Sequence, residues 1–103
     1  MRIIITAALL GLASIAHAGP MAALDRAEAR QANQDRRIDA GVAQGQIAPR
    51  EARLLNRQQA HIDRAIDRRV SDGLYSRRDA RIVRAQQRGA SGSIRFARHN
   101  RWR

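Results

Sequence analysis

The feature that most constrains this chain is a match of its sequence to itself at an offset of 28 residues. The segment 44–55 aligns with the segment 72–83, and the match continues on both sides of them. The matching positions pair Gly45 with Gly73, Glu51 with Asp79, Val42 with Val70, Ile38 with Ile66 and Ile94, and Gln31 with Gln59 and Gln87. A fixed period of this length is typical of a supersecondary unit used more than once. The repeat is therefore a stronger guide to the fold than local signals are.

Each copy of the repeat reads as a helix, a tight turn and a second helix. Gly45 and Gly73 suit the left-handed residue that ends a helix, and Pro49 suits the first turn of the next helix. Ser76 and Asp79 have the spacing of a capping box, in which each side chain binds the other residue's backbone N–H. The sequence therefore predicts helices near 21–43, 49–71 and 77–90, with turns near 44–48 and 72–76.

Apolar residues lie on one stripe of each predicted helix, at spacings of three, four or seven. They are Leu24, Ile38 and Val42 in the first helix, Leu54, Leu55, Ile62, Ile66 and Val70 in the second, and Ile82 and Val83 in the third. The predicted fold class is all-α: two overlapping helix–turn–helix repeats that form a small helical hairpin or three-helix bundle. Because the stripes are thin, we expect a marginal monomer, or helices completed by self-association or by a partner.

The first 18 residues have the pattern of a cleavable signal peptide. Arg2 precedes an uncharged apolar run of 13 residues, and Ala16 and Ala18 are the small residues that a signal peptidase reads. The run is shorter than the roughly 20 residues that a transmembrane helix needs. The predicted organisation is a signal peptide over 1–18, a helical repeat domain over 19–90 and a flexible basic tail over 91–103. We expect a periplasmic or secreted protein without an integral membrane span after processing.

The charge of the chain is strongly positive. Twenty arginines, no lysine and nine acidic residues give a formal net charge of +11. Such a field attracts anionic partners, and the planar guanidinium suits carboxylate and phosphate. A GC-rich genome is the favoured explanation for the uniform use of arginine. Cysteine is absent, so no disulfide framework supports the fold.

The sequence contains no catalytic or metal-binding constellation, and we expect neither an enzyme nor a cofactor. After Ala18 only two histidines remain, His61 and His99, and a closed zinc site needs four ligands. Carboxylates four residues apart, as in Asp63 and Asp67, could act as an acid/base pair, but arginines surround them. Solvated ion pairs are the simpler interpretation.

The two turns resemble the second half of an EF-hand loop, with Gly73 and Asp79 or Gly45 and Glu51 at the matching positions. In that alignment Arg68 or Ala40 would occupy the first ligand position, so the loops cannot supply six to eight oxygens. We therefore interpret them as helix-capping turns without calcium ligands.

The C-terminal segment interleaves arginine with two aromatic residues and contains no acid. Its candidate anion-binding residues are Arg95, Phe96, Arg98, Arg101, Trp102 and Arg103. This combination suits stacking on bases or an anionic membrane interface. A disordered terminus with no function explains it equally well.

With the repeat in view, the chain resembles a family of small exported proteins of Gram-negative bacteria, with repeated Gly-x-Leu-Thr-x-x-Glu units. The residues that carry the resemblance are Arg30-Gln31-x-x-Gln34-x-x-Arg37-Ile38, Gly45-x-Ile47-Ala48-x-x-Glu51-Ala52, Asp72-Gly73 and Arg98-His99-Asn100. At Ala48 and Asp79 the family more often has threonine and glutamate. The resemblance implies export and helical hairpins, and it implies no activity.

These sequence features predict two alternative functions of different classes. The first is a non-enzymatic periplasmic interaction protein, stress-related or chaperone-like, that holds protein clients or envelope components on its apolar stripes. The second is a cationic binder of an anionic surface: membrane lipid, lipopolysaccharide or nucleic acid. Protection of a client that persists at moderate salt would favour the first, and salt-sensitive binding would favour the second.

Overall fold

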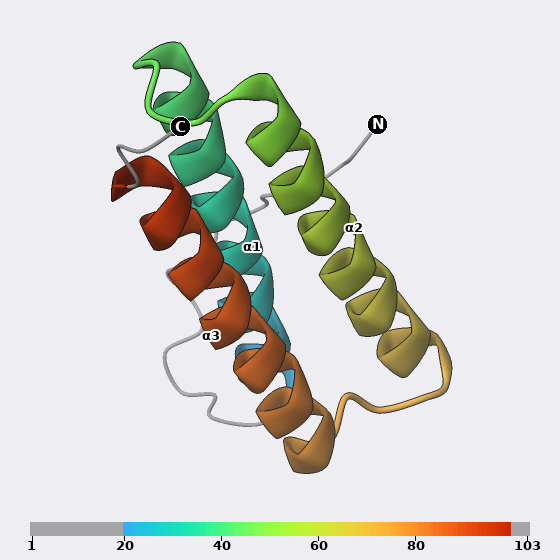
Figure 1. The fold of residues 1–103 in the computed structure, drawn as a ribbon. Helices are drawn as coiled ribbons and strands as arrows, with labels where there is room; N and C mark the ends of the chain where they lie inside the picture. The colour runs from blue at the N-terminus through green and yellow to red at the C-terminus, as the bar shows by residue number, and fades with distance from the viewer. Residues whose placement is uncertain (1–19, 100–103) are drawn as a thin grey trace.

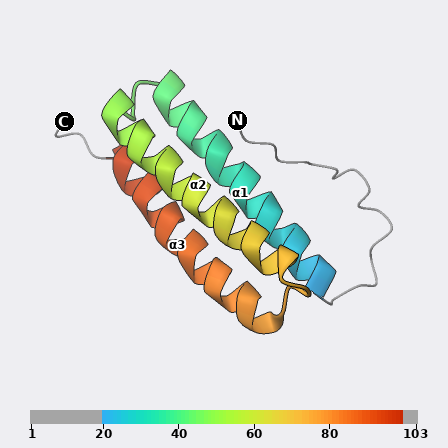
Figure 2. The same cartoon turned by 90° about the vertical axis from the view of Figure 1, so that its right-hand side faces the viewer.

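The computed structural model describes residues 20–99, which form three helices. They are α1 (Pro20–Ala43), α2 (Pro49–Ser71) and α3 (Arg77–His99). The helices pack side by side, and α2 runs antiparallel to α1 and α3 (Figure 1, Figure 2). The expected all-α fold is confirmed as a three-helix bundle. In the part of the chain that the structure describes, no helix is long and apolar enough to cross a membrane.

Two helices begin and end where the sequence predicts, whereas the third is longer. The limits of α2 agree with the predicted range 49–71, and α1 begins one residue earlier than expected. The prediction that the third helix ends near residue 90 is wrong, because α3 continues to His99. Two glycines inside α3, Gly89 and Gly92, reduce its local propensity by about 1 kcal/mol each. Burial of Ile94 and Ala97 against the other helices outweighs that loss.

The flexible basic tail expected over 91–103 is therefore helical over 91–99. The remaining residues 100–103, which include Arg101, Trp102 and Arg103, lie outside the described residues. The predicted signal peptide, with Ala16 and Ala18, lies outside them as well.

Residues 28 positions apart are buried in all three helices. Three sets of such residues are buried: Ala27, Leu55 and Val83; Gln31, Gln59 and Gln87; and Ile38, Ile66 and Ile94. Within each helix these positions are spaced by four and seven residues, as along the seam of a coiled coil. The offset of 28 residues is a whole number of heptads. Each helix therefore starts at the same point of the heptad pattern as the helix before it, and the same positions are buried.

The core consists of two apolar clusters with a polar layer between them. One contains Ala27, Ile62, Ile66, Tyr75, Val83 and Ala90, and the other contains Ile38, Ile47, Leu55, Ile94 and Ala97. Each turn supplies one large side chain, Tyr75 to the first cluster and Ile47 to the second. The polar layer consists of four buried glutamines: Gln31, Gln34, Gln59 and Gln87.

The turns have the conformations expected of helix caps. Gly45 and Gly73 adopt positive φ angles of 76° and 132°, which glycine adopts without strain. Ser76 and Asp79 form a reciprocal capping box, each side chain binding the other backbone N–H at 3.0 Å. At the start of α2 only half of such a box exists: the Glu51 carboxylate accepts a hydrogen bond of 2.9 Å from the Ala48 N–H. Both acids thus serve as helix caps.

Candidate anion-binding groove

The basic charge of the bundle is concentrated on α3. Seven arginines and a single acid, Asp79, lie on α3, whereas α1 has four of each and α2 has six arginines and three acids. Several α3 arginines follow a core position directly: Arg84 follows Val83, and Arg88 follows Gln87. Five of them form one row along the helix: Arg77, Arg81, Arg84, Arg88 and Arg95. All five are exposed, so α3 presents a continuous basic stripe beside the core.

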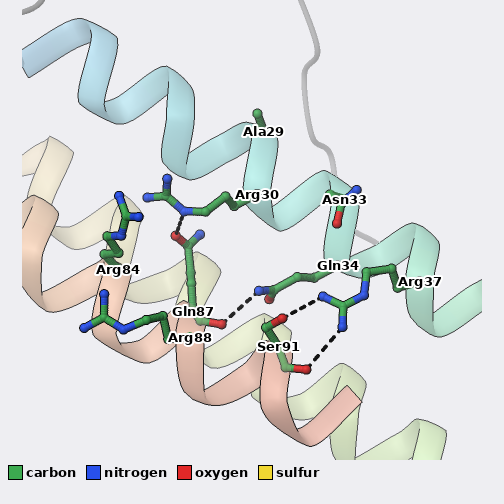
Figure 3. Close-up of a pocket in the computed structure, with 9 residues that line it drawn as sticks. All are labelled: Ala29, Arg30, Asn33, Gln34, Arg37, Arg84, Gln87, Arg88 and Ser91. Atoms are coloured by element: carbon green, nitrogen blue, oxygen red, sulfur yellow. Dashed lines mark hydrogen bonds between the residues drawn. The ribbon is translucent and has the colours of Figure 1, made fainter. Parts of the chain in front are cut away.

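This stripe borders a pocket of about 340 Å³ between α1 and α3 (Figure 3). Nine residues line the pocket: Ala29, Arg30, Asn33, Gln34, Arg37, Arg84, Gln87, Arg88 and Ser91. Four of the nine are arginines, two from each helix, and none is acidic. The volume is at the lower end of the range for small-molecule sites.

The two α1 arginines of the groove are held in place by α3. Arg30 donates from Nε to Gln87 Oε1 at 2.7 Å. Arg37 donates from Nη1 to Ser91 Oγ at 2.8 Å and from Nη2 to the Ser91 carbonyl at 3.2 Å. These bonds position two guanidinium groups at the wall of the pocket (Figure 3).

Burial and like charges act against the charged form of both α1 arginines. The pKa of Arg30 lies below its ordinary value because of desolvation and then the charge of Arg84. The pKa of Arg37 is lowered by desolvation, Arg95 and Arg98. Arginine remains protonated in proteins, so the groove carries four positive charges at neutral pH.

The α3 side of the groove is less constrained. Arg84 and Arg88 are exposed and make no hydrogen bond or ion pair within residues 20–99. Arg84 lies close enough to Arg30 for its charge to act on it, while Arg37 approaches the pocket from its other end (Figure 3). The groove thus combines two held arginines with two that can adjust to a bound group.

A chain of buried amides fixes Gln87, which in turn holds Arg30. Gln87 donates to the Ala27 carbonyl at 2.8 Å and to Gln31 Oε1 at 3.0 Å. Gln31 donates to Gln59 Oε1 at 3.1 Å and to Asp63 Oδ1 at 2.8 Å. The network therefore crosses the bundle from the α1/α3 groove to the α1/α2 side.

Three of the residues nominated from the C-terminal sequence, Arg95, Phe96 and Arg98, are part of helix α3. Arg95 and Phe96 are exposed in the last turns of α3, with 70% of Phe96 accessible. Arg98 instead binds the first turn, donating to Gln46 Oε1 at 2.7 Å and to Gln44 Oε1 at 3.2 Å. Arg98 thus fastens the end of α3 to the turn between α1 and α2.

The groove residues are absent from the sequence-based candidates. One sequence signal could have found them, namely that arginine directly follows or precedes a core position at Arg30, Arg37, Arg84 and Arg88. The matched glutamines of the repeat were a second signal, since a polar residue recurs at a position of the apolar pattern. Neither signal reveals that α1 and α3 meet.

Metal-binding geometry is not present in residues 20–99. No group of three or more acidic or histidine side chains could hold an ion there. His61 is exposed, and His99 pairs its Nδ1 with the Arg95 carbonyl at 2.8 Å. Asp63 accepts a hydrogen bond from Gln31, so it takes part in the polar layer.

Comparison with protein-family models, curated proteins and solved structures finds no match to this chain. The structure defines it as a small three-helix bundle with a basic groove between α1 and α3.

Proposed function

We propose that this protein is a non-enzymatic binding protein whose partner is anionic, and that α3 and its groove with α1 form the binding surface. The observation that supports this is the gathering of four arginines around one pocket with no carboxylate among its lining residues. At positions that flank a helix–helix seam, opposite charges usually pair across the seam. An arrangement that keeps like charges together at a cost in stability is expected at a functional surface.

The physical basis of such binding is electrostatic. A positive surface releases counterions from a polyanion on binding, so affinity falls steeply as salt rises. The predicted export places the surface in the periplasm or outside the cell, where envelope components carry phosphate. We propose both this location and an anionic partner there.

The test compares two triple variants with equal charge change. R81Q/R84Q/R88Q removes three arginines of the α3 stripe, and R53Q/R57Q/R64Q removes three exposed arginines of α2. Binding of dextran sulfate, a generic linear polyanion, is measured by fluorescence anisotropy over a salt series. The α3 triple should lose at least about tenfold in affinity and show a shallower salt slope, because about three contacts are lost.

The α2 triple is the control and should change affinity by less than about threefold, since only the long-range field changes. Equal losses in both variants would show that net charge alone drives binding. No binding by the wild-type protein at low salt would contradict the proposal.

A chaperone-like interaction protein is the second candidate, and exposed apolar side chains favour it. Leu54, Leu74 and Phe96 are 56%, 82% and 70% exposed. However, Leu55, Ile62 and Ile66, which the sequence offered as a client-binding stripe, are buried in the core. Suppression of client aggregation that persists at moderate salt and is lost in L74S/F96S would support this candidate.

A further inference from the structure

We infer that the α1/α3 groove is a discrete site for a chain of two or more linked phosphate groups, as in a diphosphate or triphosphate. This inference rests on the proposed function and names the ligand class of the same surface. It is carried by the charge, length and lining of the groove.

The charge of the groove matches more than one phosphate. Arg30, Arg37, Arg84 and Arg88 contribute four positive charges, and no lining residue is negative. A phosphate monoester carries a charge of about −1.5 to −2 at neutral pH. One such group leaves about half of the positive charge uncompensated, whereas two balance it.

The length of the groove also indicates a ligand with more than one phosphate group. Arg30 and Arg37 are seven residues apart on α1, which corresponds to about 10 Å along the helix axis. Arg84 and Arg88 lie at the Arg30 end, and Arg37 faces the pocket from the other end (Figure 3). A single phosphate has too short a reach to bind both ends, because charge-assisted hydrogen bonds are about 2.7–2.9 Å long.

The donors of the groove are partly organised before a ligand arrives. Arg30 uses only Nε to bind Gln87, so both of its terminal nitrogens remain available to a ligand. The Gln87 amide is fixed by its bonds to Ala27 and Gln31, which limits the motion of Arg30. A held arginine loses less conformational entropy on binding, which favours a defined site over diffuse attraction.

The lining also indicates which part of a ligand is recognised. No aromatic side chain lines the pocket, so there is no platform for a base to stack on. Ala29 is the one apolar residue of the lining, and the other eight residues each carry a polar or charged end. The groove therefore suits the phosphate chain itself, whether free in solution or attached to a lipid.

Calorimetric titration of the purified protein at moderate salt tests the inference, with inorganic triphosphate, diphosphate and orthophosphate as probes. We expect triphosphate and diphosphate to bind at one site per chain, at least about tenfold more tightly than orthophosphate. R84Q/R88Q should weaken triphosphate binding at least about tenfold, as expected when one partner of a close charge pair is removed. R57Q/R64Q on α2 is the matched control and should change it by less than about twofold.

Several results would overturn the inference while leaving the proposed function in place. These are equal affinity for triphosphate and orthophosphate, equal losses in both double variants, or no saturable triphosphate binding while dextran sulfate still binds. Loss of dextran sulfate binding as well would overturn both.

Phosphatidylcholine vesicles, with and without a prenyl diphosphate, distinguish the two sources of the phosphate chain. Binding confined to the doped vesicles and competed by triphosphate supports a lipid-linked ligand. Triphosphate binding without vesicle binding supports a free one. Binding to undoped vesicles that triphosphate does not compete would contradict a phosphate-specific site.

Discussion

Helix α1 packs against α3 along one seam and against α2 along another, and the two seams carry opposite kinds of charge. On the side of α3, Arg30 and Arg37 face Arg84 and Arg88 across the groove. On the side of α2, Gln31 binds Asp63, and the neighbouring acid Asp67 raises the pKa of Glu28. The four arginines and four acids of α1 balance in sequence, and two of the arginines, Arg30 and Arg37, lie at the groove with α3.

Each seam thus places like charges near each other, Arg84 near Arg30 and Asp67 near Glu28. The pKa of Glu28 is raised mainly by burial, then by Asp25 and Asp67, and that of Arg30 is lowered by burial and Arg84. The two seams differ in the kind of group to which their buried glutamine side chains bind. Gln87 orients an arginine at the basic seam, whereas Gln31 ends the network on a carboxylate at the acidic one.

We expect the largest effect on stability from removing the buried glutamine side chains of the polar layer. Q87A leaves Gln31 Oε1 and the Ala27 carbonyl without their partner in the core, and Q59A does the same to Gln34 Oε1. Each should lower the free energy of unfolding by about 3 kcal/mol, measured by urea denaturation. Only Q87A should also weaken triphosphate binding, because it releases Arg30. Losses below about 1 kcal/mol would show that the polar layer contributes little.

A second substitution reverses one charge in the basic seam. R84E places a carboxylate beside Arg30, so repulsion becomes attraction and the bundle should gain about 0.5–1 kcal/mol. The same change should lower affinity for anions by more than about tenfold. Thermal unfolding and calorimetric titration measure the two effects. A variant that is both less stable and unchanged in binding would refute the description of this seam.

The matched change in the acidic seam is D67R. An arginine there faces Glu28, and we expect a gain of about 0.5 kcal/mol with anion binding within about twofold of the wild type. Together with R84E it tests whether the two seams are independent. A large fall in anion affinity from D67R would show that they are not.

The smallest effect concerns pH. Because the pKa of Glu28 in the folded protein lies above the ordinary value of 4.5, the folded state binds the proton more tightly than the unfolded state. Stability should therefore fall as pH rises from about 4.5 through the raised pKa. E28Q should remove that dependence and be more stable than the wild type at neutral pH by less than about 0.5 kcal/mol, since water screens so exposed a group. Chemical denaturation at several pH values measures the difference, which should vanish in acid.

The sequence predicted the parts of the fold that depend on local signals. Pro49, Gly45 and the Ser76–Asp79 box mark the ends of helices, and the structure places each in that role. The prediction failed beyond residue 90, where a flexible basic tail was expected and α3 continues. Helix formation there depends on Ile94 and Ala97, whose burial partners are distant in sequence.

The groove could not be predicted in the same way. Arg37 and Ser91 are 54 residues apart, and so remote a contact has no local signal. The basic C-terminal segment was recognised as a candidate, but the structure directs Arg98 to the turn and places four other arginines at the pocket.

The sequence by itself determined that the chain forms three helices and where its two turns lie, because propensity, capping and a 28-residue period act over a few residues and repeat in register. It also determined that the protein is strongly basic. Only the tertiary structure decided that α1 and α3 run in the same direction side by side, which brings Arg30 next to Arg84 and leaves Glu28 near Asp67 of α2. Which charges meet depends on helix direction and rotation about the shared core, and these follow from packing.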